Sequence, residues 1–325
     1  MEAELTTLEE NGNWTITDLP SGKQPVGWFL NEEFKIKNLE QLKYVLGIEV
    51  AWCKRGISLS QRQYALEILE EVGYLGCKRA DFSMETNLKL HNTDEDLLTD
   101  PTSHRRLIGK LLYLTTTRPD IFYFVGKLSQ FMNKPAKAHI NATYRVLRYI
   151  KQNQGQGLYF PVDSELHIKD FCDSDWGGCK DTRNSITRYY MLFGHSLVSW
   201  KSKKHSMVSR SSTEAEYRAL ASATYEVLWL KYLLADMKID HSVPALLFCD
   251  NQSALHIAEN LVFHERTKHT EIDCYVVREK LQVGVTKTIH ISSDQQAADI
   301  LTKSFGKLQF HNLLRKMNMI DIYSS

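Results

Sequence analysis

The second half of the chain carries hydrophobic patterns in an order that restricts its fold class. Three short runs of β-type composition come first, between residues 165 and 202, and turn signals such as GGCKD separate them. A long helical pattern from Ser212 to Met237 follows, and strands and helices then alternate up to a helix expected from Asp294. A meander of three strands followed by this alternation predicts an α/β domain with a mixed five-stranded sheet.

The first half carries a different pattern. Residues 102–151 have apolar residues at helical spacing, and Pro119 and Pro135 stand where new helical segments begin. Upstream, LKYVLGIEVAWCKRGISLSQ predicts a hairpin, and QRQYALEILEEVG predicts a helix that ends at Gly73. The polar stretch 151–157 is the clearest break, so we expect an α-rich region before it and the mixed sheet after it.

Composition limits the classes of function. With 325 residues, 43% of them hydrophobic, the chain can bury two cores of ordinary size. Its 40 basic and 39 acidic residues nearly cancel, so any surface that binds nucleic acid must be local. The opening residues lack the basic and then apolar run of a secretory signal, and no stretch approaches the roughly 20 apolar residues of a membrane span. We therefore expect a soluble intracellular protein with no membrane partner.

Four carboxylates stand where a mixed sheet and its helices can bring them together: Asp173 and Asp250 at strand ends, Glu216 near the start of the long helix, and Asp299 in the last predicted helix. Hydrolysis of a phosphodiester by two metal ions needs several carboxylates in one place, because they hold two divalent cations roughly 3.5–4 Å apart. The pattern therefore predicts a site for two divalent ions.

Each carboxylate also has a purely structural explanation. Asp250 can cap the helix that begins at Gln252, and Glu216 can form a capping box with Thr213. An aspartate at a strand end or on a solvated helix face needs no further role. The residues taken singly leave both alternatives open.

Helix geometry distinguishes Glu216 from its neighbour Glu214. Two residues apart, their side chains point about 200° apart around the helix, so only one can face a given site. The apolar stripe Leu220, Ala223, Val227 and Leu234 marks the buried face, and Glu216 lies one turn before its start. We expect Glu216 near Asp173 and Asp250, and Glu214 in solvent.

The six cysteines include no C-x-x-C pair, which favours reduced thiols. Cys172 and Cys249 directly precede Asp173 and Asp250. Because neighbouring side chains on a strand point to opposite faces, we expect both thiols to be buried on the face away from the two acids.

A cluster of basic residues precedes the long helix: Lys201, Lys203, Lys204, His205 and Arg210. These side chains can line the phosphates of a nucleic acid, and binding would then weaken with salt. A solvated loop explains the same charges equally well.

Several longer motifs resemble the ribonuclease H domain of copia-type retrotransposon Pol polyproteins. They are FCDSDWGGCKDTRNS, SRSSTEAEYRALASATYEVLWLKYLL, LLFCDNQSALHIAEN, VFHERTKHTEIDCYVVREKL and DQQAADILTKSF. The resemblance covers residues 157–314 almost continuously. It implies a ribonuclease H-like mixed five-stranded sheet and carries the family's metal-binding and catalytic acids onto Asp173, Glu216, Asp250 and Asp299.

The family's activity would then be that of a hydrolase. The resemblance implies Mg²⁺ or Mn²⁺ as cofactor, an RNA:DNA hybrid as partner, and endonucleolytic cleavage of the RNA strand by two-metal hydrolysis. A catalytically inactive retrotransposon remnant that at most binds nucleic acid is the alternative.

The resemblance continues upstream. FKIKNLEQLKYVLGIEV and YLTTTRPDIFYFVGKLSQFMNKPAKAHINATYRVLRYIK are similar to the C-terminal part of a copia-type reverse transcriptase, a thumb or connection-like region. The implied domains are an N-terminal reverse transcriptase fragment at 1–28, the C-terminal part of that domain at 29–156, and ribonuclease H at 157–318. The family's palm carries an Asp-Asp pair, and this chain contains none, so no polymerase activity is expected.

Three residues depart from the family's pattern. Arg188 stands where Gly is usual, Tyr275 where His is common and Ile140 where Trp is common. A long basic side chain at position 188, on a predicted strand, is expected to disturb the packing of the sheet.

Overall fold

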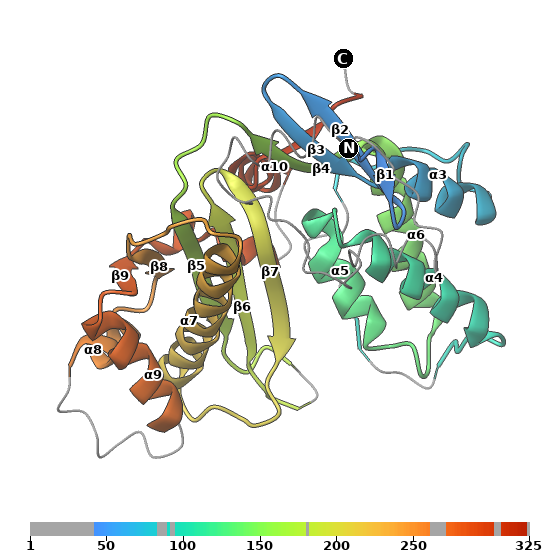
Figure 1. Cartoon of the computed structure of the whole chain (residues 1–325). Coiled ribbons are helices and arrows are strands. Elements are labelled where there is room, and N and C mark those ends of the chain that lie inside the picture. The colour runs from blue at the N-terminus through green and yellow to red at the C-terminus, as the bar shows by residue number, and fades with distance from the viewer. Residues whose placement is uncertain are drawn as a thin grey trace, which may run out of the picture.

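The computed structural model describes residues 42–82, 90–91, 95–179, 182–260, 271–301 and 307–323. Two five-stranded sheets organise these residues, each with its own set of helices (Figure 1). The fragment predicted for residues 1–28 lies outside the described part of the chain.

The C-terminal sheet has the strand order β7-β6-β5-β8-β9. Its strands are β5 (Ile168–Asp175), β6 (Ile186–Phe193), β7 (Ser196–Lys204), β8 (Ala245–Cys249) and β9 (Thr286–His290). The first three pair antiparallel as a meander, and β8 and β9 add in parallel on the other side of β5. The predicted ribonuclease H-like mixed sheet is therefore confirmed.

Three helices cover one face of this sheet: α7 (Ser212–Asp236), α8 (Gln252–Glu259) and α9 (Glu271–Gln282). Figure 1 shows α7 running along the sheet, and the predicted stripe of Leu220, Ala223, Val227 and Leu234 is buried beneath it. Cys172 of β5 and Cys249 of β8 belong to the same apolar core. Burial of this stripe, rather than helix propensity alone, fixes α7 on the sheet.

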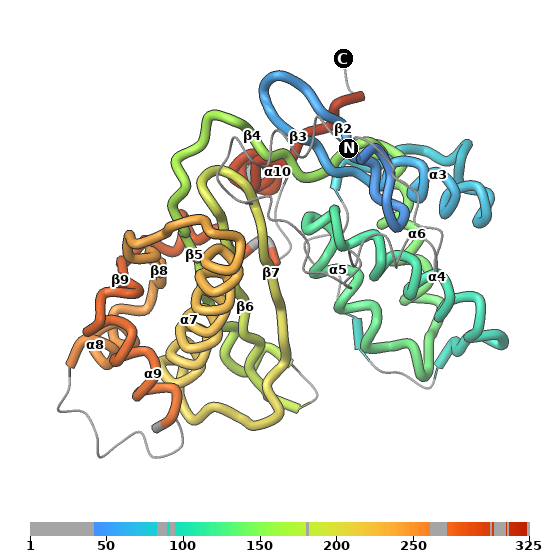
Figure 2. Tube along the Cα trace, viewed as in Figure 1, coloured from blue at the N-terminus to red at the C-terminus, as the bar shows by residue number. Residues whose placement is uncertain are grey.

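The N-terminal sheet is antiparallel, with the order β1-β2-β3-β4-β10. Its strands are β1 (Tyr44–Val45), β2 (Ile48–Cys53), β3 (Gly56–Ser60), β4 (Gln156–Pro161) and β10 (Met319–Asp321). The tube in Figure 2 shows β10, near the end of the chain, returning beside β4. The predicted hairpin before Ser60 is confirmed, whereas β4 begins inside the stretch expected to be a break.

Five further helices share one apolar core with residues of β3, β4 and β10: α3 (Arg62–Glu71), α4 (Pro101–Leu114), α5 (Pro119–Ser129), α6 (Lys137–Gln152) and α10 (Lys307–Lys316). The predicted α-rich region is confirmed in these helices. Because β4 and β10 both join the N-terminal sheet, residues from the segment 157–318 contribute to two sheets. The division of the chain at residue 157 remains a prediction.

A second core lies on the face of the C-terminal sheet opposite α7. Phe171 and Tyr190 from that sheet pack there with α5 and with the 3-10 helix η3 (Ala297–Leu301). The α-helix predicted from Asp294 is wrong, because two 3-10 segments, η2 (Ser293–Gln295) and η3, stand there instead. Gln296 interrupts them with extended backbone, at φ −65° and ψ 103°.

Candidate active site

Arg188 and Asp173 lie directly opposite each other on β6 and β5. The Arg188 side chain is 1% exposed, and its Nη1 donates to Oδ2 of Asp173 and, over 3.2 Å, to Oδ1 of Asp299. Its Nη2 lies 3.6 Å from Oδ2 of Asp175. Pairing at position 188 is regular with both neighbouring strands, so the expected disturbance of the sheet is wrong. The arginine is accommodated because two buried carboxylates, those of Asp173 and Asp299, pair with its charge.

Asp299 reaches the sheet through η3, whose place is set by a glutamine that the sequence patterns did not indicate. The buried Gln296 donates from Nε2 to the carbonyl oxygen of Cys172 over 2.9 Å, and its Oε1 accepts from the amide of Ala298. These bonds tie η3 to β5 and bring Asp299 beside Arg188.

Glu216 lies on α7 and reaches the same end of the C-terminal sheet from the opposite face. Its carboxylate is buried with the residue 6% exposed, and Oε1 accepts from the amide of Ser174 over 3.2 Å. Its Oε2 has no hydrogen-bond partner among the residues that the structure describes. Burial raises the pKa of Glu216 to about 11, with the nearby Asp173, Cys249 and Asp250 adding to the effect.

Asp250 follows directly after β8, so a third element contributes a carboxylate to this end of the sheet. Its Oδ2 accepts from the hydroxyl of Ser293 over 2.7 Å. One ligand atom from each of Glu216, Cys249 and Asp250 lies within 4.8 Å of the others. We call Asp173, Glu216, Asp250 and Asp299 the acid cluster.

The capping roles that competed for two of these acids belong to other residues. Ser211 caps α7 by accepting from the amide of Glu214, and Asn251 caps α8 by accepting from the amide of Ala254. Neither Glu216 nor Asp250 is therefore needed to begin a helix.

Glu214 lies outside the acid cluster, as helix geometry predicts, but its predicted exposure to solvent is wrong. Its side chain is 17% exposed and forms a salt bridge of 2.9 Å with Arg218 one turn later. Its Oε2 also accepts from the amide of Arg210. The carboxylate supports the start of α7 rather than the cluster.

The cysteine prediction is confirmed in part. Cys172 and Cys249 are fully buried. The expected separation from the acids is wrong for Cys249, because its Sγ belongs to the same close group as Glu216 and Asp250. Glu216 enters from the α7 face, which is the face where both thiols lie.

The acid cluster has two unlike ends with respect to a cation. At the Glu216 and Asp250 end, a buried carboxylate oxygen has no hydrogen-bond partner among the described residues. Oxygens of these two acids converge there beside the Cys249 sulfur, and carboxylate oxygens are ligands that Mg²⁺ or Mn²⁺ takes. At the Asp173 and Asp299 end, Arg188 already supplies the positive charge. The residues present thus fit a divalent ion at the first end only.

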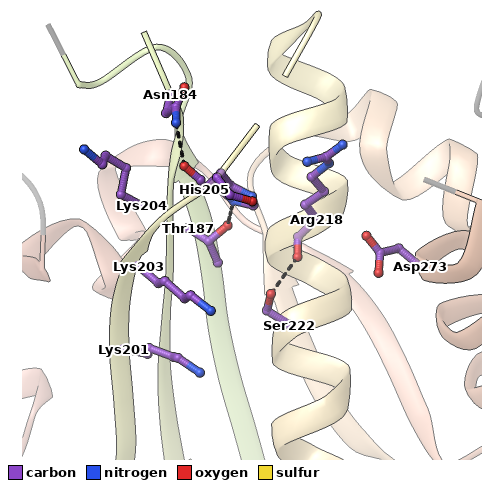
Figure 3. Close-up of a pocket in the computed structure, with 10 residues that line it drawn as sticks. Asn184, Thr187, Lys201, Lys203, Lys204, His205, Arg218, Ser222 and Asp273 are labelled. Atoms are coloured by element: carbon purple, nitrogen blue, oxygen red, sulfur yellow. Dashed lines mark hydrogen bonds between the residues drawn. The ribbon is translucent and has the colours of Figure 1, made fainter. Parts of the chain in front are cut away.

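Basic side chains gather in a pocket of about 570 Å³ between β6, β7 and α7, which we call the basic pocket (Figure 3). Its lining includes Lys201, Lys203, Lys204, His205, Arg218 and Asn184. All three predicted lysines and His205 therefore come together, and the lysines lie on a strand rather than in a loop. The remaining candidate, Arg210, is exposed and is not part of the lining.

The sequence patterns missed Arg218 and Asn184 in the basic pocket. Figure 3 shows Arg218 on α7, across the pocket from the strand that carries the lysines, with its side chain running along the helix. Asn184 donates to the carbonyl oxygen of His205 over 2.7 Å. Burial lowers the pKa of His205, and the positive charges of Arg218 and Lys203 lower it further. The pocket is therefore a locally positive site in a chain of nearly balanced charge.

None of the helices in the described part of the chain combines the length and the apolar composition that crossing a bilayer requires. No protein-family model matches the sequence.

Curated proteins with similar sequences exist. The chain is 39% identical over 293 residues to the retrovirus-related Pol polyprotein from transposon RE2 of Arabidopsis thaliana, an alignment that covers 90% of this chain and 20% of the polyprotein. It is 42% identical over 201 residues to an uncharacterized mitochondrial protein of the same plant, covering 62% of this chain and 83% of that protein. The chain spans about a fifth of the length of the Arabidopsis polyprotein.

Among solved structures, the ribonuclease H1 named LC11, isolated from compost, aligns with a TM-score of 0.33 and 16% identity. That alignment covers 42% of this chain and 93% of the ribonuclease.

Proposed function

Because this chain belongs to the retrovirus-related Pol polyproteins of copia-type transposons, we propose that its C-terminal sheet and helices hydrolyse the RNA strand of RNA:DNA hybrids with a divalent cation. One observation carries the proposal. Glu216 of α7 and Asp250 after β8 lie close together, and Glu216 also bonds to Ser174, the neighbour of Asp173 on β5. Asp173 in turn shares the Arg188 side chain with Asp299 of η3. Burying several carboxylates together costs free energy unless a cation compensates their charge.

The chain's own groups hold the carboxylates in position. The Ser174 amide orients Glu216, and the Ser293 hydroxyl orients Asp250. Glu216 and Asp250 would hold a divalent cation, which would supply an activated water and stabilise the charge of the leaving oxygen. Gln296 fixes η3, and with it Asp299, at the neighbouring edge.

The basic pocket supports the part of the proposal that concerns binding of the hybrid. Lys201 and Lys203 project from the edge strand β7 toward the face that α7 covers, and Arg218 lines the same pocket. These basic side chains at one edge of the sheet can bind phosphates of a hybrid while the acid cluster acts on the RNA strand.

A labelled hybrid tests the proposal. Protein with Mg²⁺ or Mn²⁺ is expected to shorten the RNA strand and leave the DNA strand intact, and Asp250→Asn is expected to abolish cleavage without changing the circular dichroism spectrum. Lys287→Gln, a change at the far edge strand β9, is the matched control. Cleavage that survives Asp250→Asn would remove this residue from the site.

A second candidate function is a non-catalytic unit that binds hybrids. The position of Arg188 favours it, because a permanent cation between Asp173 and Asp299 competes with the family's chemistry. Hybrid binding without cleavage, at every divalent ion concentration, would select this candidate. Nucleotide incorporation is expected in neither case, because the chain has no Asp-Asp pair.

A further inference from the structure

We propose that the Arg188 guanidinium takes the place of a divalent cation between Asp173 and Asp299, so that the protein binds such an ion only at Glu216 and Asp250. This inference rests on the proposed function in one respect: it treats the acid cluster as a cation site.

Asp173 and Arg188 are register partners on adjacent strands, so their side chains leave the same face of the sheet side by side. That face packs against η3, which carries Asp299. A single nitrogen, Nη1, then contacts one oxygen from each acid, which is how a bridging cation joins two ligands from different elements.

Arg188 also excludes a divalent ion from the position between Asp173 and Asp299. An ion that bridged the same two oxygens would need the space that Nη1 fills, because Mg²⁺ lies about 2.0–2.1 Å from its ligands. Arg188 is 1% exposed, and its Nη2 lies 3.6 Å from Oδ2 of Asp175. If the side chain moved out into solvent, it would lose its contacts with three carboxylates. The guanidinium and a second divalent ion are therefore alternatives at this position.

The positive charge that Arg188 brings to this position is permanent. An arginine stays protonated in proteins, so no change of pH in the working range removes the charge. At the other end of the acid cluster, no comparable side chain is present among the described residues: Glu216 accepts from a backbone amide and Asp250 from a hydroxyl. The two ends should thus differ in affinity for a cation at every pH where the acids are ionised.

Titration calorimetry with Mn²⁺ on the whole chain tests the inference. The wild-type protein is expected to bind no more than one ion, and Arg188→Gly is expected to bind one more. In the double variant Arg188→Gly, Asp299→Asn, the added ion should be lost. Equal stoichiometry in the wild type and Arg188→Gly would overturn the inference.

A second pair of variants keeps the test valid if Arg188→Gly fails to fold. In the wild-type background, Asp299→Asn should leave Mn²⁺ affinity within twofold, whereas Asp250→Asn should weaken it at least tenfold. Equal weakening by both would show that Asp299 is already a ligand and would overturn the inference.

Hybrid cleavage separates this inference from the proposed function. Arg188→Gly that gains an ion yet cuts no RNA would leave the inference standing and contradict the nuclease proposal. Cleavage by the wild type with no gain of an ion in Arg188→Gly would do the reverse.

Discussion

Nη1 of Arg188 lies 3.2 Å from Oδ1 of Asp299, although 111 residues separate the two positions. The contact is a hydrogen-bonded ion pair that joins the meander of the C-terminal sheet to η3. It places a buried arginine between two acids that the family's pattern assigns to metal ions.

Glu216→Gln and Glu214→Gln form a matched pair in one helix. The first should weaken Mn²⁺ binding at least tenfold, because the amide lacks the charge that holds the ion. The second should leave Mn²⁺ binding unchanged and lower the free energy of unfolding by no more than ~0.5 kcal/mol, the usual size of a pair one turn apart on a helix. Calorimetry and chemical denaturation measure both. Loss of binding in the Glu214 variant alone would reverse the assignment.

Gln296→Ala should destabilise the fold and displace Asp299. The change removes two hydrogen bonds of a buried amide and leaves the Cys172 carbonyl without its partner, which costs about 1–3 kcal/mol. Gln295→Ala, at the exposed neighbouring position, is the control and should be nearly neutral. Urea denaturation of the two variants gives the comparison, and equal stability would mean that Gln296 does not hold η3.

Lys203→Gln should weaken hybrid binding and reduce its dependence on salt. Each lost phosphate contact lowers the slope of log affinity against log salt by about 0.9. The control is Lys287→Gln, which changes an exposed lysine on the opposite edge strand of the same sheet. Fluorescence anisotropy across a salt series measures both slopes. An unchanged slope for Lys203→Gln would place the hybrid away from the basic pocket.

Asp170 should make stability fall as pH rises. Burial raises its folded-state pKa to about 8, above the value near 3.9 expected in the unfolded chain. The folded state therefore keeps the proton more firmly, and the free energy of unfolding declines between about pH 4 and pH 8. Asp170→Asn keeps an acceptor for the Tyr190 amide and should reduce this decline. Thermal melts across that range test it, with the exposed Asp163→Asn as control.

The strands and helices of the C-terminal sheet could be predicted because their patterns are local. Alternation along β5 and the apolar stripe of α7 are both visible in short windows of sequence. The same stripe correctly placed Glu216 toward the sheet end. β4 and β10 could not be found in this way, because one begins in a polar stretch and the other has only three residues.

The surroundings of the acid cluster depend on contacts that no window contains. Gln296 bonds to the backbone of Cys172 across 124 residues, and a backbone carbonyl leaves no mark on the sequence. Arg188 was visible as a departure from the family's pattern, but its partner Asp299 becomes apparent only when η3 packs on the sheet. The sequence thus indicated that position 188 was unusual and gave the wrong physical consequence.

Anomalous diffraction from Mn²⁺-soaked crystals locates each ion relative to the four acids. We expect no Mn²⁺ peak between Asp173 and Asp299 in the wild type, a peak beside Glu216 and Asp250, and a second peak between Asp173 and Asp299 in Arg188→Gly. A wild-type peak between Asp173 and Asp299, or no peak at the acid cluster in either protein, would contradict this expectation.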